Sequence, residues 1–202
     1  MTTLQDSPMM RIRTALETIH DRASSNLLTH HPWKIEREGQ LWAVTTDGYR
    51  MLLIAGDSEW EPWPSTEILS SQVINNMFAP LEHETVIPFA DLLAFSHSDV
   101  KVAACPRCGK NCTWCKEQPN IAYGWFNGAC VNRLLLGDVL PLLDAETVVV
   151  GLTQYPTHWH FAFPCFHVRA SSWHFALMGM NIRLGPDSSG LELCSEIPSH
   201  DA

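Results

Sequence analysis

A helix pattern followed by three short strand patterns, all within the first 55 residues, is the feature that most limits how this chain can fold. Apolar residues recur at helical spacing in residues 9–23, and this stripe consists of Ile12, Ala15, Leu16, Ile19 and Ala23. Turns at Glu38-Gly39 and Asp47-Gly48 separate the strand-like segments PWKIERE, QLWAVTT and YRMLLIA. Asp-Gly between such strands predicts a type I′ hairpin, because that turn needs positive φ at both central residues. We therefore expect one helix and three antiparallel strands.

The same order of patterns returns in the second half of the chain. A strand-like IAYGWFNGACVN precedes a helical pattern over residues 131–144, and TVVVGLT, HWHFAF and WHFALMGM then read as three strands. Pro141 has no amide hydrogen to donate, so it is expected to bend or break this helix near residue 137. The sequence thus predicts an α+β fold with two β-α-β-β-β units, near residues 3–55 and 125–182.

The 202 residues suit one domain with a sizeable insertion. We expect a first unit at 1–55, an insertion at 56–120, a second unit at 121–184 and a flexible tail at 185–202. Within the insertion, residues 56–84 are expected to be irregular, and residues 86–97 to contain a short helix after Pro88.

Composition narrows the classes of protein that this chain can represent. The net charge of −9 argues against a nucleic-acid-coating protein. No run approaches the ~18–20 apolar residues of a membrane span, and the first residues lack the apolar core of a signal peptide. Seven cysteines, an odd number with four close together, suit a reducing compartment better than a disulfide framework. A cytoplasmic protein without membrane contact is expected.

The four clustered cysteines have metal-ligand spacing. The stretch CPRCGKNCTWC places them at Cys105, Cys108, Cys112 and Cys115. Four thiolates match the tetrahedral preference of Zn²⁺, and a closed site of this kind leaves no position for a substrate. A structural zinc knuckle is the preferred interpretation, and an iron–sulfur cluster or free thiols are the alternatives.

Two stretches, residues 43–51 and 128–182, resemble the DNA polymerase III β sliding clamp of bacteria. Residues 43–51, AVTTDGYRM, are similar to the clamp's A-T-D-G-H-R-L hairpin, with Tyr49 for His and Met51 for Leu. Residues 128–136, GACVNRLLL, resemble its G-x-x-N-x-x-Y-L-x segment, and residues 176–182, ALMGMNI, resemble its closing strand V-V-M-P-M-R-L, with Gly179 for Pro. The resemblance implies a single clamp-like domain, where a clamp chain has three, and the cysteine insertion is foreign to it.

The resemblance also implies a binding pocket. In the family, this hairpin and this closing strand together accept a short hydrophobic peptide from polymerases and other DNA-handling proteins. Carried over, one wall would consist of Thr46, Gly48, Tyr49, Arg50 and Met51, and the other of Ala176 and Met178. Methionine adapts its shape to apolar guests, and Arg50 can donate to a peptide carbonyl or carboxylate. The alternative is that Asp47 and Gly48 only make a turn and that Arg50 is solvated.

Clamp helices present basic residues to DNA, and here such residues are few. The candidates for DNA contact are Arg11, Arg13, Arg22 and Arg133. Acidic neighbours on both helices offset them, and phosphate affinity rises with the number of phosphates neutralised. The resemblance therefore supports a partner pocket better than it supports a DNA ring.

These patterns favour a non-enzymatic, clamp-like binding protein that engages a DNA replication or repair protein and self-associates through sheet edges. Small clamp-like chains with such insertions suggest a phage or mobile-element origin. The alternative is a zinc-stabilised regulatory or inhibitory interaction protein that uses the fold as a scaffold. A metalloenzyme using His158 and His160, or a Cys165–His167 nucleophile pair, is less favoured. Nucleotide-binding and hydrolase motifs are absent.

Overall fold

The computed structural model describes residues 8–20, 33–56, 71–97, 123–154, 164–179 and 191–193. Several residues singled out above lie outside these ranges. They are the four clustered cysteines, Arg22, His158 and His160.

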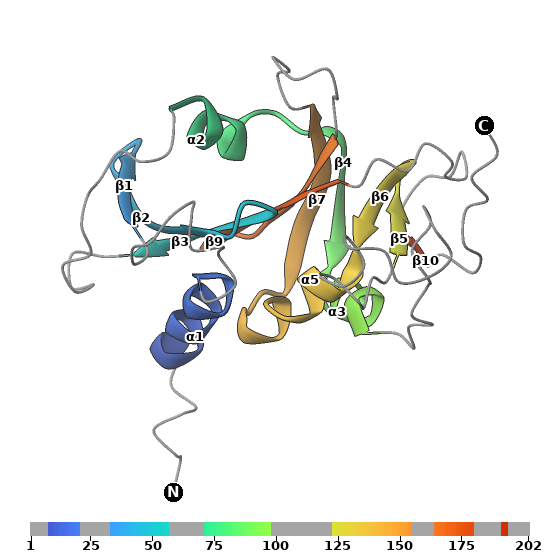
Figure 1. Cartoon of the computed structure of the whole chain (residues 1–202), viewed down its shortest axis with the longest axis horizontal. Helices are drawn as coiled ribbons and strands as arrows, with labels where there is room; N and C mark the ends of the chain where they lie inside the picture. The colour runs from blue at the N-terminus through green and yellow to red at the C-terminus, as the bar shows by residue number, and fades with distance from the viewer. Residues whose placement is uncertain are drawn as a thin grey trace, which may run out of the picture.

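Two antiparallel sheets and the helices beside them make up the described fold (Figure 1). The larger, seven-stranded sheet has the order β1-β2-β3-β9-β8-β7-β4. Its strands are β1 (Trp33–Arg37), β2 (Gln40–Thr46), β3 (Arg50–Gly56), β4 (Glu82–Pro88), β7 (Thr147–Gln154), β8 (Pro164–Arg169) and β9 (Trp173–Met178). The smaller sheet joins β10 (Leu191–Leu193), β5 (Tyr123–Phe126) and β6 (Ala129–Asn132). The helices are α1 (Pro8–His20), α2 (Ser71–Phe78), α3 (Phe89–His97), α5 (Arg133–Gly137) and the 3₁₀-helix η2 (Leu140–Leu142). The predicted α+β class with antiparallel sheet is confirmed.

The two halves of the chain meet in the middle of the larger sheet. Strand β3 from the first half pairs with β9 from the second, with Met51 opposite Ala176 and Leu53 opposite His174. We call this β3–β9 junction the seam. Strands β1–β3 of the first expected unit and β7–β9 of the second thus lie in one continuous sheet, whereas β5 and β6 lie in the smaller sheet. The seam decides which side chains of the two halves become neighbours.

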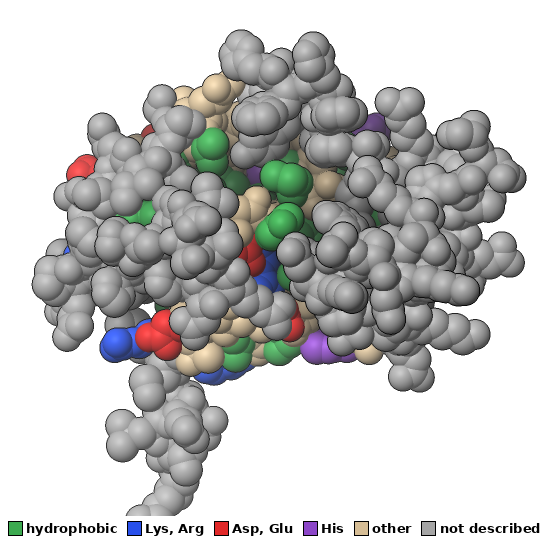
Figure 2. Space-filling view, viewed as in Figure 1, with side chains coloured by type: hydrophobic (Ala, Val, Ile, Leu, Met, Phe, Trp, Pro, Cys, Tyr) green, Lys and Arg blue, Asp and Glu red, His purple; other side chains and the backbone are tan. Residues whose placement is uncertain are grey.

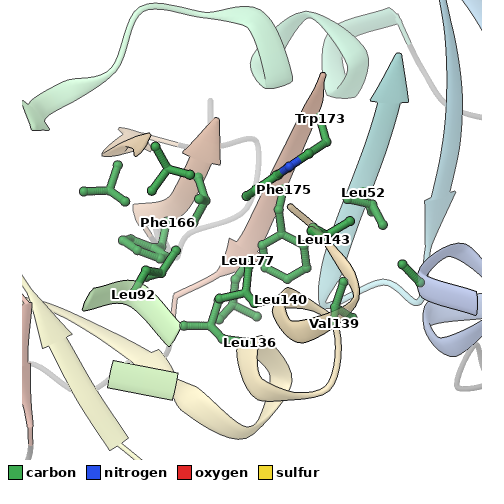
Figure 3. Packing of buried hydrophobic residues seen from close by; sticks show 14 of the residues in the cluster. Leu52, Leu92, Leu136, Val139, Leu140, Leu143, Phe166, Trp173, Phe175 and Leu177 are labelled. Atoms are coloured by element: carbon green, nitrogen blue, oxygen red, sulfur yellow. The ribbon is translucent and has the colours of Figure 1, made fainter. Parts of the chain in front are cut away.

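Helices α1, α3 and α5 cover one face of the larger sheet (Figure 1). Leu16 and Ile19 of α1 are fully buried there, together with Leu136 of α5. Figure 3 shows how Phe166, Phe175 and Leu177 point from the strands toward these helices. Because each fully buried Leu, Ile or Phe contributes roughly 1.5–3 kcal/mol, this cluster is the main source of stability.

Helix α2 covers the opposite face at the first-half end of the sheet. Met77 of α2 is buried against a second cluster that includes Trp33, Trp42 and Leu53. The rings of Trp42 and Phe78 meet edge to face, with 5.4 Å between their centroids. Strand residues alternate between the two faces, so both faces of β2, β3 and β9 are buried in this region.

The segment expected to be an insertion contributes to the main fold. Residues 71–97 form α2, β4 and α3, and β4 pairs with β7 as the last strand of the larger sheet. Prolines at 62, 64 and 80 made residues 56–84 read as irregular, although Val73, Ile74 and Met77 have helical spacing. The helix predicted after Pro88 is α3.

The second half also differs from its expected elements. The segment read as one strand before the helix is the β5–β6 hairpin, whose turn residues Asn127 and Gly128 both have positive φ, 45° and 78°. Strand β8 occupies residues 164–169, whereas HWHFAF lies at 158–163, outside the described residues. Helix α5 ends at Gly137, as Pro141 predicted. Within the expected flexible tail, residues 191–193 form β10, which pairs with β5.

Candidate functional site

A pocket of about 50 Å³ lies over the seam, on the face that carries α2. It is lined by Thr46, Gly48, Tyr49, Arg50, Met51, Val73, Asn76, Met77, Thr153, Cys165, His167, Ala176 and Met178. A volume of this size admits a few water molecules or the end of one side chain. Figure 2 shows hydrophobic side chains gathered near the centre of one face, with acidic and basic side chains directly below them in this view.

The structure brings all seven residues predicted from the family resemblance to this pocket. They arrive together because Met51 of β3 lies directly opposite Ala176 of β9 across the seam. Six lining residues were missed, and these are Val73, Asn76, Met77, Thr153, Cys165 and His167. The helical spacing of Val73 and Met77 was a usable signal for α2. The strand patterns after residue 146 predicted three successive strands, but they did not indicate which of their side chains would face the pocket.

Two large apolar side chains are exposed at the rim of the pocket. Tyr49 is 53% exposed and Met178 is 38% exposed. Their backbones are joined, because the Met178 amide donates to the Tyr49 carbonyl at 2.8 Å. The hairpin end and the end of β9 are therefore held side by side, and both rim side chains are accessible to a partner.

The hairpin turn is wider than the type I′ turn that Asp47-Gly48 predicted. Gly48 has φ of 87°, but Asp47 is not among the described residues with positive φ. The Asp47 carboxylate instead accepts from the amides of Tyr49 and Arg50, at 3.0 and 2.9 Å. Thr46 Oγ1 donates to the Arg50 carbonyl and accepts from the Gly48 amide. The polar residues around the turn are thus used to build it.

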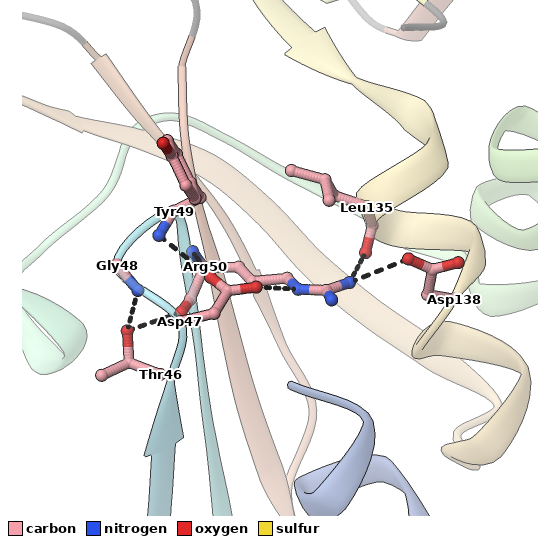
Figure 4. A network of polar contacts seen from close by, with 7 residues as sticks. All are labelled: Thr46, Asp47, Gly48, Tyr49, Arg50, Leu135 and Asp138. Carbon is pink, nitrogen blue, oxygen red and sulfur yellow. Dashed lines mark hydrogen bonds and ion pairs between the residues drawn. The ribbon is translucent and has the colours of Figure 1, made fainter. Parts of the chain in front are cut away.

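Arg50 is buried. Its burial does not favour the predicted contact between its guanidinium and a bound peptide. Its Nε donates to Asp47 at 2.8 Å, and its Nη1 donates to the Leu135 carbonyl at 2.8 Å and to Asp138 at 3.2 Å (Figure 4). The solvated alternative is also wrong, because the side chain has no exposed surface. Arg50 fastens the hairpin to α5.

Polar side chains from β7 and β8 form the inner part of the pocket. Thr153 Oγ1 and His167 Nε2 are 2.7 Å apart, and both residues are buried. Burial, with Arg169 nearby, lowers the pKa of His167 to about 3. Burial raises the pKa of the Cys165 thiol to about 12. Since neither group ionises near neutral pH, a Cys165–His167 nucleophile pair is not supported.

The three candidate DNA-contacting arginines within the described residues have other partners. Arg133 is buried and its Nε donates to the Phe95 carbonyl, a position that does not favour its predicted DNA contact. Arg11 donates to the Pro141 carbonyl at 2.9 Å. Arg13 is exposed and pairs with Glu17 on the same helix. In the described part of the chain, α1 therefore presents no concentrated basic surface.

The described residues contain no group of three or more His, Cys, Asp or Glu side chains placed to hold a metal ion. The predicted four-cysteine site is outside those residues. Among the helices of the described segments, none is long and apolar enough to cross a membrane.

The described part of the chain combines an antiparallel sheet that is continuous across its two halves with helices packed on that sheet. The chain has the fold of the bacterial DNA polymerase III β sliding clamps. It is similar to the β subunit from Pseudomonas aeruginosa, with a TM-score of 0.52, 10% identity and coverage of 90% of this chain and 69% of that chain.

Two further clamp structures show the same likeness. The β subunit from Borrelia burgdorferi, solved in complex with a natural product, has a TM-score of 0.51 at 7% identity, over 85% of this chain and 62% of that chain. A putative β subunit from Eubacterium rectale has a TM-score of 0.50 at 11% identity, over 87% of this chain and 64% of that chain. No protein-family model and no curated protein matches the sequence. The chain thus spans 62–69% of the clamps compared, and at these identities the likeness shows the fold alone.

One departure from the clamp strand has a local cause. Gly179 stands where the resembling strand has proline, and its amide donates to the Pro164 carbonyl at 2.9 Å. A Cβ at this position would lie 2.3 Å from the same oxygen. Proline lacks the amide hydrogen and adds the clashing carbon, so glycine is required by the way β8 begins here.

Proposed function

We propose that this protein is a non-enzymatic, clamp-like binding protein that engages a hydrophobic segment of a DNA replication or repair protein. The segment would insert one side chain into the pocket over the seam and lie across Tyr49 and Met178. The observation that carries this proposal is the convergence of the hairpin and the end of β9 on one pocket with an exposed apolar rim. Concave apolar sites with a few polar groups are the usual form of such binding sites.

The chemistry of the lining fits an apolar anchor. Met51 and Met77 are flexible thioethers that adapt to guests of different shape. The neighbouring charges of Arg50 and Asp47 are paired with one another and buried, so they do not compete for the segment. Binding would therefore depend mainly on the apolar contacts at the rim and on the inserted side chain.

The proposal is tested with a displayed library of random peptides, selected on the full chain. We expect enrichment of peptides with large apolar residues. A synthetic peptide from this set should bind the Tyr49→Ala, Met178→Ala double variant at least about tenfold more weakly by fluorescence anisotropy, because apolar anchors carry most of the energy of such contacts. Val86→Ala is the matched control, since Val86 is 64% exposed on β4 and is not a lining residue.

Equal loss of affinity in the control, or no loss in the double variant, would contradict the pocket and favour the alternative of a regulatory protein that uses the fold as a scaffold. The class of partner is tested by capture from an extract of the source cell, with and without nuclease treatment. We expect captured replication or repair proteins to survive nuclease treatment and to be lost with the double variant. Partners that disappear with nuclease would indicate binding through DNA.

We also propose that copies of the chain associate through the edges of the larger sheet. Strands β1 and β4 are its two outer strands. Strand β4 carries Glu82 and Glu84, whereas β1 carries Lys34 and Arg37 with Glu36, so the two edges differ in sign of charge. Light scattering that gives the mass of one chain at high concentration would contradict this association.

A further inference from the structure

The pocket contains polar atoms that a purely apolar guest would leave without partners. Besides Arg50, two of its lining residues carry a buried side-chain nitrogen for which the described residues provide no hydrogen-bond partner. They are Asn76 Nδ2 on α2 and His167 Nδ1 on β8. Both belong to the face of the sheet that α2 covers. The Arg50 guanidinium, which also has one unpartnered nitrogen, extends away to α5 instead (Figure 4).

His167 is held in place by its other ring nitrogen. Nε2 lies 2.7 Å from Thr153 Oγ1, and the side chain is 1% exposed. A hydroxyl can donate to Nε2 or accept from it, so the Thr153 contact allows either neutral tautomer. Nδ1 is then either an acceptor or a donor. The imidazole can therefore adapt to a guest that supplies the complementary group.

A buried nitrogen without a hydrogen-bond partner destabilises the folded chain, and a bound group that forms the missing hydrogen bond would remove this destabilisation. A buried polar atom without a partner is destabilising, and nearly all such atoms in folded proteins are paired. A charged guest is disfavoured, because the pocket is otherwise lined by Met51, Met77 and Ala176, and the nearby Arg50 charge is already compensated. An uncharged group that both donates and accepts has the chemistry that complements Asn76 and His167.

We infer that the pocket selects an inserted group with an apolar stem and an uncharged end that both donates and accepts a hydrogen bond, such as a hydroxyl or carboxamide, through Asn76 and His167. This inference rests on the proposed function, since it concerns the same pocket. The inference adds that the inserted group must carry a hydrogen-bonding end, which contact with the apolar rim alone would not require. Discrimination between two guests of one shape then depends on the hydrogen bond alone.

Three small probes that share one ring test this selection. They are p-cresol, which carries a hydroxyl, toluene, which lacks it, and p-toluate, which carries a charge. The full chain, labelled with ¹³C at methionine methyls, reports binding through the signals of Met51, Met77 and Met178. We expect p-cresol to bind about five to ten times more tightly than toluene, the usual effect of one hydrogen bond, and p-toluate to bind more weakly than p-cresol.

The His167→Leu variant should lose the preference for p-cresol while still binding toluene. His174→Leu is the matched control, because His174 lies on the same face with an unpartnered buried Nδ1 but does not line the pocket. It should keep the preference. If His167→Leu does not fold, His167→Gln, which retains a donor and an acceptor, should keep part of the preference, and Asn76→Leu should reduce it.

Equal affinity of the wild-type chain for p-cresol and toluene would overturn the inference and leave the proposed apolar pocket standing. Tighter binding of p-toluate would overturn it in favour of an anion site. If none of the probes shifts the three methionine signals, both the inference and the pocket fail. A preference that persists in His167→Leu and in Asn76→Leu would overturn the assignment to these residues.

Discussion

At the scale of single residues, Arg50 links parts of the chain that are distant in sequence. It bonds to Asp47 in its own hairpin and to Leu135 and Asp138 at α5. Its position in a hairpin next to Asp-Gly suggested either a solvated side chain or a ligand contact. Burial of the guanidinium depends on α5, which packs there only in the folded chain. For this reason its role was not readable from the local sequence.

Arg50→Ala is expected to lower the free energy of unfolding by about 3–5 kcal/mol, because it leaves the buried Asp47 carboxylate without its positively charged partner. Urea denaturation followed by tryptophan fluorescence measures the change. Arg13→Ala is the control, since Arg13 forms an exposed ion pair with Glu17. That variant should change stability by less than about 1 kcal/mol. Similar, small losses in both variants would contradict a structural role for Arg50.

At the scale of elements, much of the secondary structure was predictable from the sequence, but the pairing of strands that are distant in sequence was not. The apolar stripe predicted α1, and Pro141 predicted the early end of α5. Asn127-Gly128 was a hairpin signal that was overlooked in a segment read as one strand. The adjacency of β3 and β9 arises from long-range pairing, for which no local pattern exists. The Thr153–His167 contact in the pocket depends on that same sheet order.

The face beneath α2 carries one buried histidine, His167, and one half-buried histidine, His174, and this makes stability depend on pH. Burial, with Arg169 nearby, lowers the pKa of His167 to about 3 and that of His174 to about 4. Both are neutral in the folded chain, whereas in the unfolded chain they gain protons below about pH 6.5. Above pH 6.5 these histidines are neutral in both states, so they do not change the free energy of unfolding. As the pH falls from 6.5 toward 4, they bind protons only in the unfolded chain, and the folded state therefore loses stability.

We expect the free energy of unfolding to fall by up to about 1.4 kcal/mol per pH unit for each of these histidines over that window. Urea denaturation at several pH values between 7.5 and 4 measures it. Carboxylates contribute to the same profile, so the His167→Gln, His174→Gln double variant is the reference. Its pH profile should be flatter than that of the wild type. Parallel profiles would show that the two imidazoles are not buried in the neutral form.

At the scale of the whole molecule, the clamp-like fold is observed, whereas the metal site remains a prediction. Short motifs at residues 43–51, 128–136 and 176–182 predicted the clamp-like fold that the solved structures share. The four-cysteine zinc knuckle stays a prediction, because residues 105–115 are outside the described part. Four thiolates at C-x2-C-x3-C-x2-C spacing are the argument for zinc.

Elemental analysis of the purified chain should give one zinc per chain, and little iron. Cys108→Ser should remove that zinc and lower the melting temperature, because a structural site contributes to folding. Cys194→Ser, which alters a cysteine outside the cluster, should keep both. Iron in place of zinc would indicate a cluster. A second metal ion retained in Cys108→Ser would revive the metalloenzyme alternative.

The pocket lies over the seam, where the two halves of the chain join, so a molecule bound in it would contact both halves. A guest would touch residues from both halves at once, so it would resist their separation as well as occupy a cavity. A ligand at a hundred times its dissociation constant adds about 2.7 kcal/mol to the stability of the state that binds it. Heat resistance is thus a direct assay for the natural guest: fractions of a cell extract that delay melting of the intact chain, but not of its rim variant, contain it.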